Sequence, residues 1–371
     1  MDEMMALNLT YIISISIITF AVLILPNLSR KNLVLGVRFP NEYKERDEIK
    51  KVVRDFRFLT ILFGIISIII TIVITSIFPD NFRVQTIFLL INSLIPLYPL
   101  IISAKKLKIL KEDFRIEEPR EKVIVNTHLS RDKINYSNIS LAYYILPALV
   151  VIASAAYSLI NYDRYPDMIP INYGFDGRAN GFSHKSILTV LMPSLTSAFI
   201  VLTIFISNLF YLKMKQKIDP AAPEETILRL LKARRIWTKF YIISSFVLVL
   251  FISVFQTNMM INDIRQDRYF VFIILALVFF LVAISLLLAF RVGTLGEKLR
   301  YGSSDREIIL PEDDDSHWYL GGVVYYNSND PAFIVAKRLG VGYTVNMGST
   351  IGKLCAIAIF LMIIAFSIIP F

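Results

Sequence analysis

The stretch FLTILFGIISIIITIVITSIF, residues 58–78, contains no charged side chain. A helix needs about 20 apolar residues to cross a hydrocarbon core roughly 30 Å thick, so this stretch predicts a membrane-spanning helix. Seven further stretches also lack Asp, Glu, Lys, Arg and His: 6–25, 84–104, 141–160, 187–212, 240–260, 269–290 and 354–370. We therefore predict an all-α polytopic membrane protein with eight transmembrane helices. The composition agrees, because hydrophobic residues make up 55% of the 371 residues.

The basic residues are concentrated in alternate gaps between these stretches. Of 39 Lys and Arg residues, 33 lie in the first, third, fifth and seventh gaps, and six lie in the others. Short loops rich in Lys and Arg stay in the cytoplasm, so both termini are predicted to lie outside. This asymmetry explains the net charge of +9 without nucleic acid. It also favours attraction to anionic lipid headgroups on the inner leaflet.

The pattern divides the chain into five regions. They are an N-terminal three-helix membrane region with basic loops (1–140), a helix–loop–helix domain (141–212), two further membrane helices (213–290), a small α+β cytoplasmic domain between helices seven and eight (291–350), and the last membrane helix (351–371). The first stretch has no basic leader and no small-residue cleavage site, which indicates a retained helix. The single cysteine, Cys355, is expected to be a small apolar packing residue.

Two of the cytoplasmic loops contain helix-start signals. Asn41 is predicted to cap a helix whose apolar positions Ile49, Val52 and Phe56 repeat at helical spacing and which runs into the second span. Pro223, followed by two glutamates, marks a second helix start. Each loop is therefore expected to lead into the next span as a helix.

The loop between the fourth and fifth spans is the best candidate for a ligand site. Asp176-Gly177 and Asn180-Gly181 are strong turn signals, so a small ordered cap is expected outside the membrane. The loop brings both charge signs near aromatic side chains, a combination suited to a peptide partly embedded in the outer leaflet. The candidate ligand-binding residues are Asp167, Asn172, Tyr173, Phe175, Asp176, Arg178 and Asn180.

The cytoplasmic domain between the last two spans carries a second unusual sequence. We expect strand-like segments around Trp318–Tyr326 and Gly342–Asn346, with a short helix at Ala332–Leu339 between them. The acidic run Glu312–Asp315, beside His317, is interpreted as a solvated turn, and a divalent ion there is the less favoured alternative. The candidate residues for contact with a cytoplasmic partner are Arg38, Trp318, Tyr325 and Tyr326.

Both unusual segments resemble known membrane proteins. The outer sequence, through Pro170, Asn172, Phe175, Asp176, Gly177, Asn180 and Gly181, resembles the loop of a membrane domain of unknown function found in SdpI-type immunity proteins of Gram-positive bacteria. Residues 318–346 resemble a second domain of unknown function that accompanies the first in longer membrane proteins. Asn32, Gly36, Arg38 and Pro40 are similar to an asparagine–glycine–arginine–proline pattern of SdpI-like proteins.

This resemblance implies a function that composition and spacing do not give. SdpI-like proteins protect the cell from a secreted toxic peptide, and they sense that peptide and hold a transcriptional repressor at the membrane. The resemblance therefore implies an immunity or sensor protein of the Gram-positive plasma membrane, with an antimicrobial peptide outside and a repressor-type protein inside as partners. This chain differs from the short SdpI plan in its additional spans and its cytoplasmic domain.

Signs of other chemistry are sparse. The spans contain no ionisable residue of the kind that drives transport, and His128, His184 and His317 stand alone, so neither a metal nor another cofactor is expected. An intramembrane enzyme is the weakest hypothesis for the same reason. The alternative function is a permease for a small apolar or peptide substrate, in a cavity lined by Asn92, Pro96 and Pro193 at kinked helices.

Overall fold

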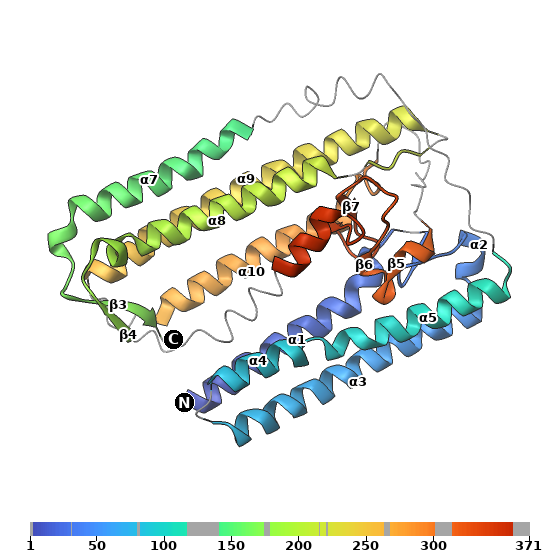
Figure 1. Cartoon of the computed structure of the whole chain (residues 1–371), viewed down its shortest axis with the longest axis horizontal. Coiled ribbons are helices and arrows are strands. Elements are labelled where there is room, and N and C mark those ends of the chain that lie inside the picture. The colour runs from blue at the N-terminus through green and yellow to red at the C-terminus, as the bar shows by residue number, and fades with distance from the viewer. Residues whose placement is uncertain are drawn as a thin grey trace. The chain divides into compact units, whose positions relative to one another are not determined.

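The computed structural model is mostly helical, with short two-stranded antiparallel sheets (Figure 1). It describes residues 3–30, 32–79, 82–116, 141–173, 179–214, 216–219, 222–262, 268–300 and 314–358. Within these ranges, six helices are long and apolar enough to cross a membrane. The chain therefore has the character of a multi-pass membrane protein. The stretch 354–370 lies largely outside the described residues, so the count of eight spans stays a prediction.

The six helical segments match the first six predicted stretches. They are α1 (Glu3–Leu28), α3 (Asp47–Ile77), α4 (Phe82–Asn92) with α5 (Tyr98–Asp113), η2 (Leu141–Tyr144) with α7 (Ile145–Ile160), α8 (Ile187–Lys213), and α9 (Pro223–Asn262). The seventh stretch forms α10 (Arg268–Arg291), of which Ala276–Arg291 counts as a shorter apolar helix. Pro223 begins α9 as predicted, with Glu224 and Glu225 in its first turn.

Helix α3 buries two different kinds of side chain along one face. Near its start it buries Ile49, Val52 and Phe56, as the helical spacing predicted. Further along, the same face buries small and hydroxyl-bearing residues, namely Thr60, Gly64, Ser67, Thr71 and Thr75. The opposite face exposes large aliphatic side chains there, including Ile65 and Ile69. Small residues at the interface and aliphatic residues outside are the pattern of a helix packed within lipid.

The start of this helix differs from the prediction. Asn41 begins only a short helix, α2 (Asn41–Lys44), whose N-cap is Pro40 without a side-chain hydrogen bond. The long helix begins separately at Asp47, after Glu45 and Arg46. The predicted amphipathic segment and the second span nevertheless form one continuous helix, because α3 runs without a break to Ile77.

The third stretch is interrupted in the middle. Helix α4 (Phe82–Asn92) ends before the 3₁₀ segment η1 (Ile95–Leu97), and α5 (Tyr98–Asp113) follows. Pro96 and Pro99 lie at this junction, where a missing N–H and a fixed φ disfavour a continuous helix. Asn92 stabilises the break, because its amide nitrogen donates to the Ser67 carbonyl at 2.8 Å and to the Thr71 hydroxyl at 2.7 Å.

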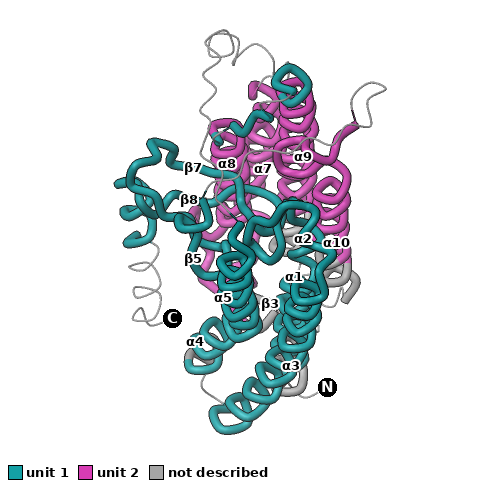
Figure 2. The backbone as a smooth tube through the Cα atoms, turned by 90° about the vertical axis from the view of Figure 1, so that its right-hand side faces the viewer, with its two compact units in different colours: residues 1–124, 214–226, 305–371 teal, residues 125–213, 227–304 magenta. Residues whose placement is uncertain are grey.

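The chain folds as two compact units, coloured separately in Figure 2. Unit 1 combines residues 1–124, 214–226 and 305–371, and unit 2 combines residues 125–213 and 227–304. The core of unit 1 includes Val22 from α1, Phe56 from α3, and Leu100 and Leu107 from α5. Polar side chains join the helices of unit 2, as Ser194 to Ser154 at 3.1 Å and Thr238 to Asn208 at 3.2 Å. Polar side chains commonly form such hydrogen bonds between membrane helices.

Within the described residues, the β structure forms three local elements. The first is the tight hairpin of β1 (Leu33–Val34) and β2 (Val37–Arg38). The second, here called the long hairpin, pairs β3 (Met168–Tyr173) with β4 (Ala179–His184) between α7 and α8. The third, here called the C-terminal element, covers residues 314–350 and contains η4 (Asp315–His317), β5 (Trp318–Tyr319), η5 (Leu320–Gly322), β6 (Val324–Tyr325), β7 (Ile334–Ala336) and β8 (Tyr343–Val345).

The C-terminal element corrects one prediction. Residues 332–339 were expected to form a helix, but Ile334–Ala336 form strand β7, which pairs with β8. The two β-branched residues Ile334 and Val335 favour an extended backbone. Gly340 and Gly342, at φ +72° and +111°, turn the chain back immediately afterwards. The predicted strand at Gly342–Asn346 is confirmed by β8.

Candidate functional site

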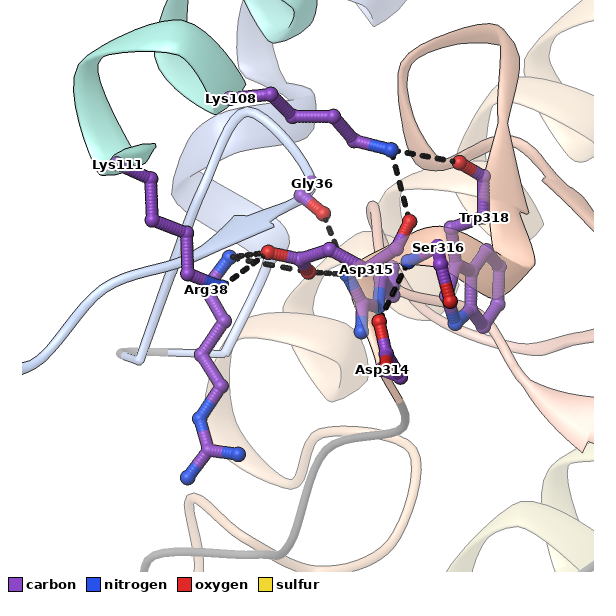
Figure 3. Close-up of polar contacts among 9 residues, drawn as sticks. Gly36, Arg38, Lys108, Lys111, Asp314, Asp315, Ser316 and Trp318 are labelled. Carbon is purple, nitrogen blue, oxygen red and sulfur yellow. Dashed lines mark hydrogen bonds and ion pairs between the residues drawn. The ribbon is translucent and has the colours of Figure 1, made fainter. Parts of the chain in front are cut away.

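Asp315 is the centre of a buried polar cluster in unit 1 (Figure 3). The cluster starts from a local turn, in which the Asp314 carboxylate accepts a hydrogen bond from the Ser316 amide at 2.7 Å. This cap begins η4 and precedes β5, and it leaves the next carboxylate, that of Asp315, buried with 5% of the residue exposed. The interpretation of this acidic run as a solvated turn is therefore wrong for Asp315.

Two cations, one from α5 and one from the C-terminal element itself, neutralise this carboxylate. Lys111 of α5 places its Nζ 2.5 Å from Asp315 Oδ2, and Arg338, which follows β7, donates Nη1 to Oδ1. The Arg38 amide of β2 also points at the carboxylate, 3.4 Å from both oxygens. Removing one partner of a buried ion pair leaves an uncompensated charge and costs about 3–5 kcal/mol. Asp315 thus joins α5, the first hairpin and the C-terminal element.

Main-chain contacts complete the same junction. Lys108 Nζ donates to the carbonyl oxygens of Asp315 at 2.8 Å and Trp318 at 3.2 Å. Arg338 Nη1 donates to the Gly36 carbonyl at 3.0 Å. Gly36 has φ +81°, and a Cβ placed there would lie 2.6 Å from the Gly321 carbonyl oxygen. Only glycine permits both this backbone conformation and this close approach.

The interior of the C-terminal element is aromatic, and side-chain hydrogen bonds hold its turn in place. Trp318 and Tyr325 face each other with ring centroids 4.9 Å apart, and the Tyr325 hydroxyl donates to Asp330 at 2.9 Å. Asn346 is fully buried, and its amide nitrogen donates to the carbonyl oxygens of Asn327 at 2.8 Å and Asp330 at 3.1 Å. This side chain holds the 327–332 turn against the end of β8.

The four predicted partner-binding residues separate into two groups. Trp318 and Tyr325 are buried, with 2% and 1% exposed, and they belong to the interior of the element. Tyr326 is 43% exposed. The Arg38 side chain extends away from Asp315, and only its main-chain amide takes part in the cluster (Figure 3). The structure thus leaves Arg38 and Tyr326 as the accessible members of this set.

The long hairpin is fixed at its base. The Tyr165 hydroxyl donates to Ser158 at 3.1 Å, and burial raises the pKa of Tyr165 even though this hydrogen bond works to lower it. Lys185 donates through Nζ to the Tyr165 carbonyl at 3.0 Å and through its amide to the Asp167 carbonyl at 2.8 Å. Its ammonium also lies 4.7 Å from the centre of the Tyr162 ring.

The predicted ligand-binding residues lie on this hairpin and its tip. Asp167 is exposed just before β3. Asn172 and Tyr173 belong to β3 and Asn180 to β4, where Asn172 is paired with Gly181. Phe175, Asp176 and Arg178 lie outside the described residues. The antiparallel pairing therefore brings the predicted residues of β3 next to the predicted residue of β4.

Comparison with known families returns two partial matches. Residues 149–196, which include most of α7, the long hairpin and the start of α8, match a domain of unknown function, DUF1648. Residues 328–353, which include β7 and β8, match a family of unknown function, DUF5808. Neither a curated protein nor a solved structure matches the chain. Together with the apolar helices, the two matches indicate a membrane protein that carries both of these domains.

Sequence reasoning missed the cations of the cluster, because no local pattern marks them. Lys111 and Arg338 resemble the other basic residues of the predicted cytoplasmic loops. Because 204 positions separate Lys111 from Asp315, their pairing leaves no local pattern in the sequence. The described residues hold no group of three or more His, Cys, Asp or Glu side chains arranged for a metal ion. The ion pairs around Asp315 are suited to holding the C-terminal element against helix α5. The long hairpin is suited to presenting exposed side chains to a ligand.

Proposed function

We propose that this chain is a multi-pass cell-membrane protein of immunity or sensor type that carries out no chemistry of its own. The long hairpin engages a membrane-active peptide outside, and the C-terminal element engages a cytoplasmic partner. The distribution of basic residues supports the orientation, because 33 of 39 lie in alternate loops. Eight spans with both termini outside complete the proposed topology.

The observation that carries this proposal is the surface of the long hairpin. Met168, Ile171 and Phe182 are 47%, 46% and 52% exposed, although the base of the hairpin is fixed by Tyr165 and Lys185. A rigid strand pair that displays large apolar side chains has already lost the conformational entropy that binding would cost. We propose that the peptide lies along this surface.

Charged and amide groups would complete the peptide site. Asp167 is exposed beside β3. Around it we propose the remaining predicted residues, which are Asn172, Tyr173, Phe175, Asp176, Arg178 and Asn180. Apolar contacts from the hairpin and polar contacts from its tip suit an amphipathic peptide at the outer leaflet, where both kinds of group are present.

For the cytoplasmic side we propose a repressor-type protein that contacts Arg38. Arg38 is partly exposed, and its guanidinium extends away from the Asp315 cluster (Figure 3). The rigid junction around Asp315 would transmit a movement of α5 to the C-terminal element.

The permease alternative finds no comparable support. Asn92, which it would place in a substrate cavity, is 1% exposed and is hydrogen-bonded to Ser67 and Thr71. A buried amide with these partners stabilises the helix break and offers no group to a substrate. We therefore propose the immunity or sensor function alone.

The function is tested by exposing cells to a panel of membrane-active peptides with and without the full-length protein. Cells that produce the protein should survive higher concentrations of at least one peptide. Phe182→Ala should remove this protection, whereas Phe199→Ala, at a 70% exposed phenylalanine of helix α8, should keep it. Equal sensitivity of producing and non-producing cells to every peptide would contradict the proposal.

A further inference from the structure

Four large side chains are exposed together at one end of the C-terminal element. Tyr319, Leu320, Val323 and Tyr326 are 53%, 55%, 42% and 43% exposed, and they surround the short segment η5. The rings of Tyr319 and Tyr326 lie edge to face with centroids 6.3 Å apart. We call these four residues the apolar tip. An exposed apolar group on such a small element indicates a surface that is covered in the native environment.

The backbone at the tip holds an exposed leucine in a strained, left-handed conformation. Leu320 has φ +49°, and Gly321 and Gly322 follow at +71° and +85°. The left-handed conformation costs a non-glycine residue about 1–2 kcal/mol. The two glycines accept it without strain, but the leucine does not. Because 55% of the surface of Leu320 is exposed, packing inside the element does not offset this strain. We therefore expect the leucine side chain to make its stabilising contacts with a partner outside the element.

The position of the tip along helix α5 defines what covers it. A Cβ on Gly321 would lie 2.9 Å from Leu100 Cγ, so η5 rests directly on Leu100. Leu100 belongs to the candidate span Ile87–Asp113 and lies five residues before Lys105, the first lysine of α5. At 1.5 Å per residue, η5 contacts the helix about 7.5 Å to the apolar side of that lysine.

A second contact places another part of the element at similar depth. A Cβ on Gly340, in the turn between β7 and β8, would lie 3.0 Å from Leu25 of α1. Leu25 is among the last apolar residues of the candidate span Tyr11–Leu28. Two separate turns of the C-terminal element therefore touch membrane helices on the apolar side of their ends.

From these contacts we infer that the apolar tip is inserted into the bilayer, at the boundary between headgroups and acyl chains of the nearer leaflet. Leu320 and Val323 lie against acyl chains, and the two tyrosines lie at headgroup level, where aromatic residues are enriched. The exposed Lys105 and Lys106 of α5 lie on the water side of the contact, where they face lipid phosphates. The covering partner is lipid, and this inference does not depend on the proposed function.

The inference is tested with nitroxide labels on the full-length protein in nanodiscs of phosphatidylcholine and phosphatidylglycerol. In a Cys355→Ala background, labels are placed by Val323→Cys at the tip and by Ser328→Cys, an exposed control in the same element. Val323 has ordinary helical dihedral angles, φ −84° and ψ −41°, so the change adds no backbone strain. Accessibility to oxygen, which concentrates in lipid, is compared with accessibility to a water-soluble nickel complex.

Insertion predicts a severalfold higher ratio of oxygen to nickel accessibility at Val323→Cys than at Ser328→Cys. Equal nickel accessibility at both sites would overturn the inference, because the tip would then be in water. Protection of Val323→Cys from both reagents would also overturn it, since a protein surface would cover the tip. Tyr326→Cys provides a second tip label if Val323→Cys lowers the yield of folded protein. Because Tyr326 lies at headgroup level, its ratio should be lower than that of Val323→Cys but still above that of Ser328→Cys.

Discussion

In the long hairpin, two strands of six residues pair with each other and leave Met168, Ile171 and Phe182 exposed. In the C-terminal element, the strands are only two or three residues long, and they enclose Trp318 and Tyr325. Both elements are attached to membrane helices. The hairpin is held at its base, whereas the C-terminal element is held by contacts distributed over residues 315–346.

The difference follows from the number of backbone hydrogen bonds that strands of each length can form. An isolated two-stranded sheet is marginal in water, and strands of two residues contribute very few ladder hydrogen bonds. The C-terminal element therefore depends on side chains, namely the Asp315 ion pairs and the Asn346 amide. The hairpin needs fewer such contacts because its backbone pairing is longer. Substitutions in the two elements should accordingly differ in size of effect.

The largest effect is expected from Asp315→Ala. This change leaves the buried Lys111 and Arg338 without their carboxylate and should lower the free energy of unfolding of unit 1 by about 3–5 kcal/mol. The matched control Asp314→Ala removes only a cap and should cost about 1 kcal/mol. Thermal unfolding of the purified protein measures both. Replacing Lys111, Asp315 and Arg338 together by Met, Leu and Met should recover much of the lost stability. A triple variant that is no more stable than Asp315→Ala would contradict the ion-pair account.

A smaller effect is expected from Gly36→Ala, which tests the close approach of the first hairpin and η5. The new methyl group would meet the Gly321 carbonyl, a main-chain atom that cannot rotate away, at a cost of about 1–3 kcal/mol. Gly342→Ala is the matched control, because its φ is also positive but nothing lies within 4 Å of the added carbon. Gly36→Ala should therefore have a lower melting temperature than Gly342→Ala, because only the first variant adds a steric clash. Equal melting temperatures would mean that Gly36 and Gly321 lie farther apart than described.

In the long hairpin, Tyr165→Phe should cost about 1 kcal/mol, because the Ser158 hydroxyl is buried and loses its donor. Tyr157→Phe, at a 47% exposed tyrosine beside Ser158 in helix α7, should leave the stability unchanged. Limited proteolysis at the hairpin compares the two. Faster cleavage of both variants, or of neither, would show that the hydroxyl does not fix the base.

The smallest effect concerns acid stability of the C-terminal element. Burial works to raise the pKa of Asp314, but hydrogen bonds from Ser316 and the charges of His317 and Lys111 outweigh it and hold the pKa below its ordinary value of 3.8. A lowered pKa in the folded state means that the associated stability is present above about pH 4 and is lost as the pH falls through the folded value. Because Asp314 is only partly buried and solvent screens its charge, the change should stay under about 1 kcal/mol. Asp314→Asn should remove this pH dependence, as unfolding between pH 5 and pH 2 would reveal.

The membrane helices could be predicted from the sequence because their signal is local. Absence of charge over 20 residues and the proline at 223 each define an element without reference to its neighbours. The stripe of Ile49, Val52 and Phe56 likewise contained enough information to predict a buried face. The break after Asn92 was only partly predictable, since Pro96 indicates a kink but not the hydrogen bonds to Ser67 and Thr71 that close it.

The polar cluster could not be predicted, because its partners are far apart in the chain. Asp315 lies in an acidic run that reads as solvated, and only the fold brings Lys111 and Arg338 to it. The expected helix at 332–339 was wrong for a different reason. Ile334 and Val335 favour an extended backbone, and the pairing of β7 with β8 stabilises it. Local patterns therefore gave the helices, and long-range contacts determined the candidate site.

The account depends most on the long hairpin and the C-terminal element lying on opposite sides of the bilayer. His184→Cys and Ser328→Cys, both exposed positions, are introduced separately into a Cys355→Ala background and treated in intact cells with a membrane-impermeant maleimide. We predict that the cysteine at 184 is labelled at once and that the cysteine at 328 is labelled only after the cells are permeabilised. Labelling of 328 in intact cells, or protection of 184, would contradict the proposed topology and the peptide-sensing function with it.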